Sequence, residues 1–137
     1  MIVESPAKAR TLEKFLGKDF VVEASAGHVR DLPPKSLGVK IDKDFLPNYQ
    51  IIKGKEKIIS TLKSAAKKAV TIYLAPDPDR EGEAIAWHLQ ALLNGNSKKI
   101  KRIEFHEITK EAVTAAVKHP RDIDLDRVNA QQARRIL

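Results

Sequence analysis

Short apolar runs alternate along the chain with longer stretches in which apolar residues recur every three or four positions. The short runs are rich in Val, Ile and Leu, which is typical of buried strands. They cover residues 1–4, 20–24, 70–75 and about 100–106. The longer stretches predict helices. These helices run from Ser5-Pro6 to Gly17, over 55–68, from Asp79 to Leu93 and from Thr109 to Pro120. Strands that alternate with helices predict an α/β fold, with an open, mainly parallel sheet and helices on both faces.

Two segments interrupt this pattern. Residues 27–54 are broken by Pro33-Pro34, Gly38, Pro47 and Gly54, which indicates an irregular excursion. Residues 121–137 predict a further helix that begins near Asp124. We therefore divide the chain into a domain at 1–120 and the truncated start of a following helical domain at 121–137. The part after Pro120 is expected to be loosely held without that domain.

Composition narrows the class of protein. A chain of 137 residues suits one domain with its own core. It contains no cysteine, so disulfides and thiolate metal sites are excluded within these residues. No apolar run is long enough to span a bilayer, and the first residues do not resemble a secretory signal. A cytoplasmic location without a membrane partner is expected.

Charge favours a phosphate-bearing partner without identifying one. The formal net charge is +7, and lysines cluster within residues 53–68 and again within 98–102. Basic patches of this kind attract nucleic-acid backbones. Lysines also commonly serve only to solvate a helix face, so either interpretation remains open for each cluster.

The most informative segment is the strand-to-helix turn at residues 77–83, where Asp77, Asp79, Glu81 and Glu83 occupy every second position. Such crowding is costly unless a cation offsets the repulsion. Carboxylate oxygens are the hard ligands that Mg²⁺ prefers, although Asp79 could simply cap the helix. Glu81 lies four residues before Ile85 and is expected on the inward helix face, which leaves Glu83 at the surface.

Glu4 follows the first predicted strand, just as the acidic turn follows the third. In open parallel sheets, ligands bind beyond the carboxyl ends of the strands. Glu4, Asp77, Asp79 and Glu81 are therefore expected to converge at one edge of the sheet.

Five segments in order resemble the N-terminal region of bacterial type IA DNA topoisomerases. They are VESPAKA at 3–9, GHVRDLP at 27–33, DPDREGEAIAWHL at 77–89, FHEIT at 105–109 and NAQQARRIL at 129–137. The likeness covers essentially the whole chain, and it implies the Toprim fold. The paired-Asp turn is shared with other Toprim proteins, whereas the first and third segments point to the topoisomerases.

The resemblance also implies roles for individual residues. Glu4 matches a proton donor to the leaving 3′-oxygen and an additional metal ligand, and Lys8 matches a lysine near the scissile phosphate. Asp77, Asp79 and Glu81 match the acidic triplet that holds Mg²⁺. The positions that match DNA contacts are His28, Arg134 and Arg135. Arg102 precedes the fourth segment, FHEIT, and is a further candidate for a phosphate contact.

The implied activity is ATP-independent relaxation of negatively supercoiled DNA. One strand is cleaved transiently through a phosphotyrosine link and then religated. The nucleophilic tyrosine is expected outside these residues, because neither Tyr49 nor Tyr73 falls in a matching segment. The implied partners are a single-stranded segment of DNA and the remaining domains of a larger chain, at the nucleoid. Another Toprim enzyme, such as a primase or nuclease, and a non-catalytic nucleic-acid-binding module remain as alternatives, as does a reverse gyrase parent.

Overall fold

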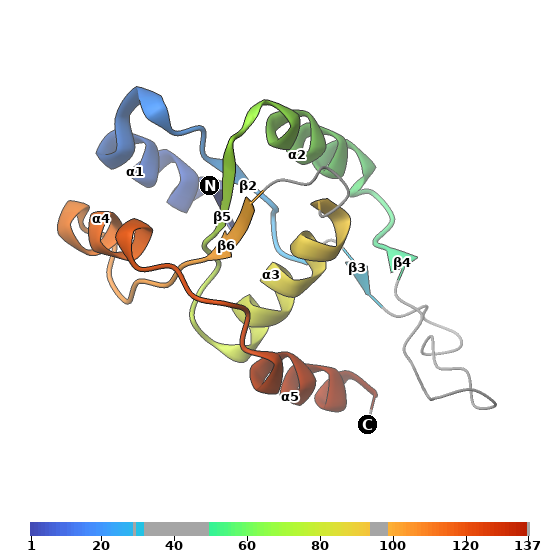
Figure 1. Ribbon diagram of the computed structural model, residues 1–137. Coiled ribbons are helices and arrows are strands. Elements are labelled where there is room, and N and C mark those ends of the chain that lie inside the picture. The colour runs from blue at the N-terminus through green and yellow to red at the C-terminus, as the bar shows by residue number, and fades with distance from the viewer. Residues whose placement is uncertain (29, 32–49, 94–98, 137) are drawn as a thin grey trace.

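A four-stranded, all-parallel sheet forms the centre of the protein in the computed structural model, which describes residues 1–28, 30–31, 50–93 and 99–136 (Figure 1). The strand order is β2-β1-β5-β6. The strands are β1 (Ile2–Val3), β2 (Glu23–Ala24), β5 (Thr71–Leu74) and β6 (Lys99–Arg102). Ile2 pairs with Glu23 on one side and with Leu74 on the other, so β1 lies inside the sheet. The predicted open parallel sheet is confirmed.

Helices cover both faces of this sheet, as the sequence predicted (Figure 1). On one face lie α2 (Glu56–Lys68) and α3 (Arg80–Leu93). On the other lie α1 (Pro6–Leu16) and α4 (Lys110–Lys118). Among the described residues, no helix is both long and apolar enough to cross a bilayer.

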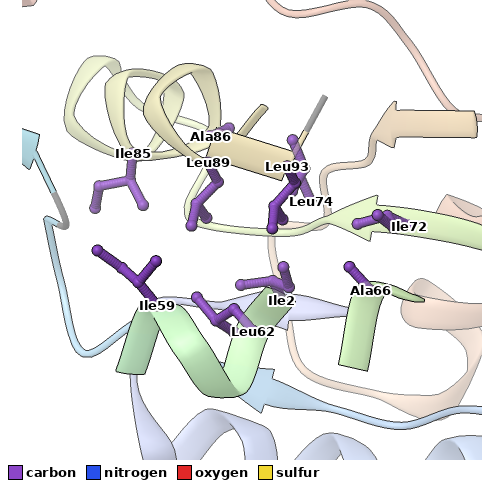
Figure 2. Close-up of a cluster of buried hydrophobic side chains, with 10 residues drawn as sticks. All are labelled: Ile2, Ile59, Leu62, Ala66, Ile72, Leu74, Ile85, Ala86, Leu89 and Leu93. Carbon is purple, nitrogen blue, oxygen red and sulfur yellow. The ribbon is translucent and has the colours of Figure 1, made fainter. Parts of the chain in front are cut away.

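The alternation of side chains along the central strands divides the core into two apolar layers. Ile2 and Leu74 pack towards α2 and α3, where Leu62 and Leu89 meet them (Figure 2). Val3, the neighbour of Ile2, packs into the second layer with α1 and α4. Because the strand ends are anchored on both faces, the turns that follow them start from fixed positions.

The helix boundaries follow from the capping residues. Ser5 Oγ accepts the backbone N–H of Lys8 at 3.2 Å at the start of α1, with Pro6 as the first helical residue. Thr109 Oγ1 accepts the N–H of Ala112 at 3.2 Å and starts α4 in the same way. Gly17, with φ +69°, ends α1 and begins the short 3₁₀ helix η1 (Gly17–Asp19).

The two interrupting segments differ in how far the structure describes them. Strands β3 (Arg30–Asp31) and β4 (Gln50–Ile51) pair antiparallel, and residues 32–49 of the expected excursion lie outside the described residues. Helix α5 (Leu125–Ile136) is present as predicted and packs against α3. Its Val128 is 1% exposed. The expectation that the chain after Pro120 is loosely held is therefore wrong for the start of α5.

Candidate active site

Glu4, Lys8 and Asp77 meet at the carboxyl ends of β1 and β5. Glu4 Oε2 accepts the backbone N–H of Asp77 at 2.7 Å. Lys8 lies one turn along α1 and donates from Nζ to Glu4 Oε1 at 2.7 Å and to the carboxylate of Asp77. The two strands are direct neighbours in the sheet, which brings the residues after them together. Glu4 and Asp77 thus lie at the same edge of the sheet, as predicted.

Lys8 is a permanent cation in this arrangement. Burial alone would lower the pKa of Lys8, but its hydrogen bonds to Asp77 and Glu4 outweigh burial and raise that pKa above its ordinary value. At neutral pH the ammonium group therefore offsets two carboxylates. It also lies in the first turn of α1, where the positive end of the helix dipole favours an anion. This corner of the sheet accordingly combines acids that attract a cation with a cation that attracts phosphate.

The next two acids of the turn point away from this contact. Asp79 Oδ1 accepts the N–H of Gly82 at 2.7 Å, so its carboxylate caps the start of α3 in the alternative way the sequence allowed. The side chain of Glu81 is 55% exposed, and the expectation that it lies on the inward helix face is wrong. Its carboxylate instead lies beside His28, with Nε2 of His28 3.2 Å from Oε2 of Glu81.

His28 reaches Glu81 through a tight turn after β2. Ala26 and Gly27 have φ values of +55° and +89°, a region that Gly adopts without strain and Ala rarely adopts. The Gly27 N–H donates to the carbonyl of Glu4 at 3.0 Å, and Lys55 Nζ donates to the carbonyl of Ala26 at 2.6 Å. The turn is therefore tied to the residue that follows β1, which places His28 beside the acidic turn.

The donor atoms at this edge fit Mg²⁺, although they do not form a closed cage. Glu4, Asp77, Asp79 and Glu81 offer only carboxylate oxygens, and the ammonium of Lys8 already takes up a position between two of them. In the part of the chain that the structure describes, no three His, Cys, Asp or Glu side chains are grouped closely enough to hold a metal. Mg²⁺ commonly retains several waters and uses substrate phosphate as a ligand, so an open set of carboxylates is compatible with it.

The site is an exposed edge and not a deep pocket. The side chains of Asp77 and Glu81 are 52% and 55% exposed. A cavity of about 420 Å³ opens at the other edge of the sheet, lined by Phe20, Val21 and Val70 among others, and none of the site side chains contributes to it. An open edge of this kind can accept an extended polymer.

Gly82 is a structural requirement of the turn that the sequence patterns did not single out. A Cβ at this position would overlap the carbonyl oxygen of Asp77 and lie 2.9 Å from its backbone nitrogen. The first turn of α3 therefore packs directly on the backbone that carries the Asp77 side chain. The signal that could have found it is a glycine inside the first turn of a helix, where its low helix propensity needs a reason.

Two predictions about charged residues are wrong. Glu83, expected at the surface, has no exposed side-chain area, and neither has Arg102, a candidate for a phosphate contact. Arg102 donates to the backbone carbonyls of Leu74, Pro76, Asp77 and Ile103 at 2.8–3.1 Å. Its Nε also donates to Glu83 Oε1 at 3.1 Å. A guanidinium engaged on five acceptors inside the protein holds the turn and does not reach DNA.

Glu83 is charged despite its burial. Burial alone would raise the pKa of its carboxyl group, but hydrogen bonds from Arg121 and the N–H of Asp124, with the charge of Arg102, lower it to about 2. The side chain of Arg121 binds both carboxylate oxygens, at 2.9 and 2.6 Å. In turn, the hydrogen bond to Glu83 raises the pKa of Arg121 above its ordinary value. This carboxylate therefore binds Arg102 and Arg121 and is not available at the exposed site.

The remaining predicted DNA contacts are placed only by their backbone. Arg134 and Arg135 belong to the last turn of α5, and their side chains lie outside the described residues. Tyr73 is half-buried in β5 and packs near Phe20, with ring centroids 6.0 Å apart. Tyr49 lies outside the described residues.

Sheet order, flanking helices and the acidic turn at the carboxyl edge define a class of domain. The Toprim domain family matches residues 1–108, and the chain belongs to this family. Full-length topoisomerase I from Thermotoga maritima is similar to this chain at 51% identity, with a TM-score of 0.89. The match covers 99% of this chain and 23% of that one, so the chain spans about a quarter of that relative. The resemblance to bacterial type IA topoisomerases is thereby confirmed.

Proposed function

We propose that the chain is the Mg²⁺-binding part of the catalytic centre of a type IA DNA topoisomerase. In that enzyme, one strand of negatively supercoiled DNA would be cleaved transiently through a phosphotyrosine link and then religated without ATP. The observation that carries the proposal is the contact of Glu4, Lys8 and Asp77 at the carboxyl ends of neighbouring strands. The family and the relative at 51% identity support it. The nucleophilic tyrosine would come from residues outside this chain.

Asp77, Asp79 and Glu81, with Glu4, would hold Mg²⁺. The ion, when bound, would offset the negative charge of the DNA phosphate in the transition state. Asp79 would have to turn its carboxylate away from the Gly82 N–H, a change of one side-chain rotamer at an exposed position. The helix would then lose one capping hydrogen bond, which costs about 1 kcal/mol. The free energy of metal binding can offset a cost of that size.

Lys8 and Glu4 divide the phosphate and proton roles between them. Because the pKa of Lys8 is raised, its ammonium stays charged and acts on a phosphate oxygen as a cation and not as a base. Glu4 is hydrogen-bonded to Lys8 and to the Asp77 N–H, and its side chain is 18% exposed. The resemblance gives Glu4 the transfer of a proton to the leaving 3′-oxygen and back on religation, which requires its carboxylate to release Lys8 and to carry a proton at that step. His28, at the same edge, would contact the DNA backbone.

We place the enzyme in the cytoplasm at the nucleoid, with DNA and the remaining domains of a longer chain as partners. The arginines at the end of α5, Arg134 and Arg135, are proposed as DNA contacts because they match the family segment. Arg102 is not part of this proposal, since its guanidinium is buried.

The test replaces two of the proposed ligands in the full-length protein. Asp77→Ala together with Asp79→Ala removes two hard oxygen donors, so we expect loss of relaxation of supercoiled plasmid at millimolar Mg²⁺. Glu13→Ala together with Glu111→Ala is the matched control, because both side chains are exposed carboxylates on other helices. Relaxation is followed by gel electrophoresis over a range of Mg²⁺ concentrations.

A companion measurement on this chain separates catalysis from simple nucleic-acid binding. We expect the wild-type chain to bind Mg²⁺ weakly and Asp77→Asn to lose that binding while folding normally. Full relaxation by the double alanine variant at ordinary Mg²⁺ concentrations would contradict the metal role. No effect of Mg²⁺ on the wild type, in either measurement, would favour the non-catalytic binding module.

A further inference from the structure

Glu83 is the centre of a polar cluster buried between α3, the end of β6 and the segment that leads into α5. Its carboxylate accepts hydrogen bonds from Arg102 Nε at 3.1 Å, from Arg121 at 2.9 and 2.6 Å, and from the Asp124 N–H at 2.8 Å. A buried ion pair seldom adds net stability over apolar packing of the same volume, because desolvation offsets the attraction. A cluster of this kind therefore suggests a role in specifying geometry.

One side of the cluster holds the backbone of the acidic turn. Arg102 donates to the carbonyl oxygens of Pro76 and Asp77, both at 2.8 Å. Arg127, on α5, donates from Nη1 to the carbonyl oxygen of Pro78 at 3.1 Å. Three consecutive carbonyls of the turn are thus bound by two guanidinium groups. The middle one belongs to the residue whose side chain contacts Lys8.

The other side of the cluster seats α5. Asp124 donates its N–H to Glu83, and its own carboxylate accepts the N–H groups of Asp126 and Arg127 at 3.0 and 3.3 Å, which caps the helix. Arg127 Nη1 lies 3.9 Å from Glu83 Oε1. Glu83 therefore contacts the beginning of α5 and, through Arg102, the backbone of the turn.

We propose that Glu83 and Arg127 are positioning residues that couple the seating of α5 to the backbone geometry of the turn at Pro76–Pro78. The inference rests on the proposed function, because it is the Asp77 carboxylate whose placement would matter for Mg²⁺. A shift of α5 moves the guanidinium of Arg127 directly, and with it the carbonyl of Pro78. Residues that follow α5 can in this way act on the acidic edge without touching it.

The test uses Arg127, because its side chain is 41% exposed. If Arg127 is replaced, the buried carboxylate of Glu83 still binds Arg102 and Arg121. Arg127→Gln removes the donor to Pro78, and Arg127→Lys retains a single cationic donor that can reach it. Arg10→Gln is the matched control, since Arg10 is exposed on α1. Glu83→Gln is a second, more disruptive variant.

Two quantities are measured in each variant. The first is the pair of amide resonances of Asp77 and Gly82, whose N–H groups bond to Glu4 and Asp79 and so report on the turn without metal. The second is the Mg²⁺ dissociation constant, obtained by titration with MgCl₂. We expect Arg127→Gln to shift both resonances and to weaken Mg²⁺ binding about 10-fold, as loss of a supporting contact does at other metal sites. Arg127→Lys should restore part of both effects, and Arg10→Gln should change neither.

The outcomes separate a positioning role from simple attachment of α5. If Arg127→Gln alters resonances of α5 alone, with the Asp77 and Gly82 amides and Mg²⁺ affinity unchanged, the coupling is refuted. If Glu83→Gln does not fold, the Arg127 variants still decide. If the wild type itself binds no Mg²⁺, the proposed function fails, and the amide resonances still decide whether α5 and the turn are coupled.

Discussion

Replacement of Gly82 by Ala tests how the turn is held, because two opposing effects act at this position. Ala has the higher helix propensity, so the substitution by itself would stabilise α3 by about 1 kcal/mol. The added Cβ, however, would overlap the carbonyl oxygen of Asp77 and lie 2.9 Å from its nitrogen. These are backbone atoms, which cannot rotate out of the way as the end of a side chain can.

The cost of the clash is expected to exceed the gain in helix propensity. Overpacking against rigid neighbours typically costs about 1–3 kcal/mol, and here relief requires the Asp77 backbone to move against its hydrogen bonds with Glu4 and Arg102. Breaking either bond adds about 1 kcal/mol. After the gain in propensity is subtracted, we expect Gly82→Ala to lower the free energy of unfolding by about 2 kcal/mol.

The assay is urea unfolding followed by circular dichroism, with the midpoint and slope fitted for each variant. Ala91→Gly is the control, because Ala91 is exposed on the same helix and the change measures propensity without a clash. That control should lose about 1 kcal/mol. The reasoning is refuted if Gly82→Ala is as stable as the wild type or more stable, since propensity would then outweigh contact with the turn.

Two further predictions concern acid and covalent chemistry. Glu83 has a pKa of about 2 in the folded chain against 4.5 ordinarily, so its ionised form contributes about 3 kcal/mol of stability that is present above the ordinary value and lost as pH falls towards 2. Because pH 3 lies inside this window, urea unfolding from pH 7 to pH 3 should show about 2 kcal/mol of this loss in the wild type and in the exposed control Glu111→Gln but not in Glu83→Gln. Equal slopes in all three would contradict it. Incubation of this chain with labelled single-stranded DNA and Mg²⁺ should give no covalent adduct, because the proposed nucleophile lies elsewhere. An adduct that disappears with Tyr49→Phe or Tyr73→Phe would make the chain a self-sufficient enzyme.

The fold was predictable because its signals are local. Ser5 and Thr109 cap helices at the predicted starts, and strand composition placed the four parallel strands in the right segments. The meeting of Glu4 with Asp77 followed from one general property of parallel sheets, that strand ends share an edge. What the patterns could not supply was the partner of each charge, because Arg121 lies 38 positions from the Glu83 that it binds.

The acidic turn shows where this limit lies. Glu81 and Glu83 were assigned to opposite sides of α3, and the structure keeps them apart, yet the exposed and the buried residue are exchanged. Residues two positions apart on a helix point about 200° away from each other around its axis. This spacing shows that Glu81 and Glu83 face different sides, but not which of them faces the protein. The assignment used the spacing of Glu81 to Ile85, whereas α5 also covers α3. Glu81 is largely exposed, and Glu83 turns towards the segment that leads from α4 into α5.

The evenly spaced carboxylates therefore divide between two purposes for a geometric reason. Asp77 and Glu81 lie on the turn or just inside the helix, beyond the reach of covering elements, and stay exposed. Glu83 is the first of the series to fall under the body of the protein, where an isolated charge would be too costly. Arginines must then accompany it, and Arg102 binds the carbonyl of Asp77 as well as the carboxylate of Glu83. The burial of one acid thus supplies the group that fixes the backbone of another.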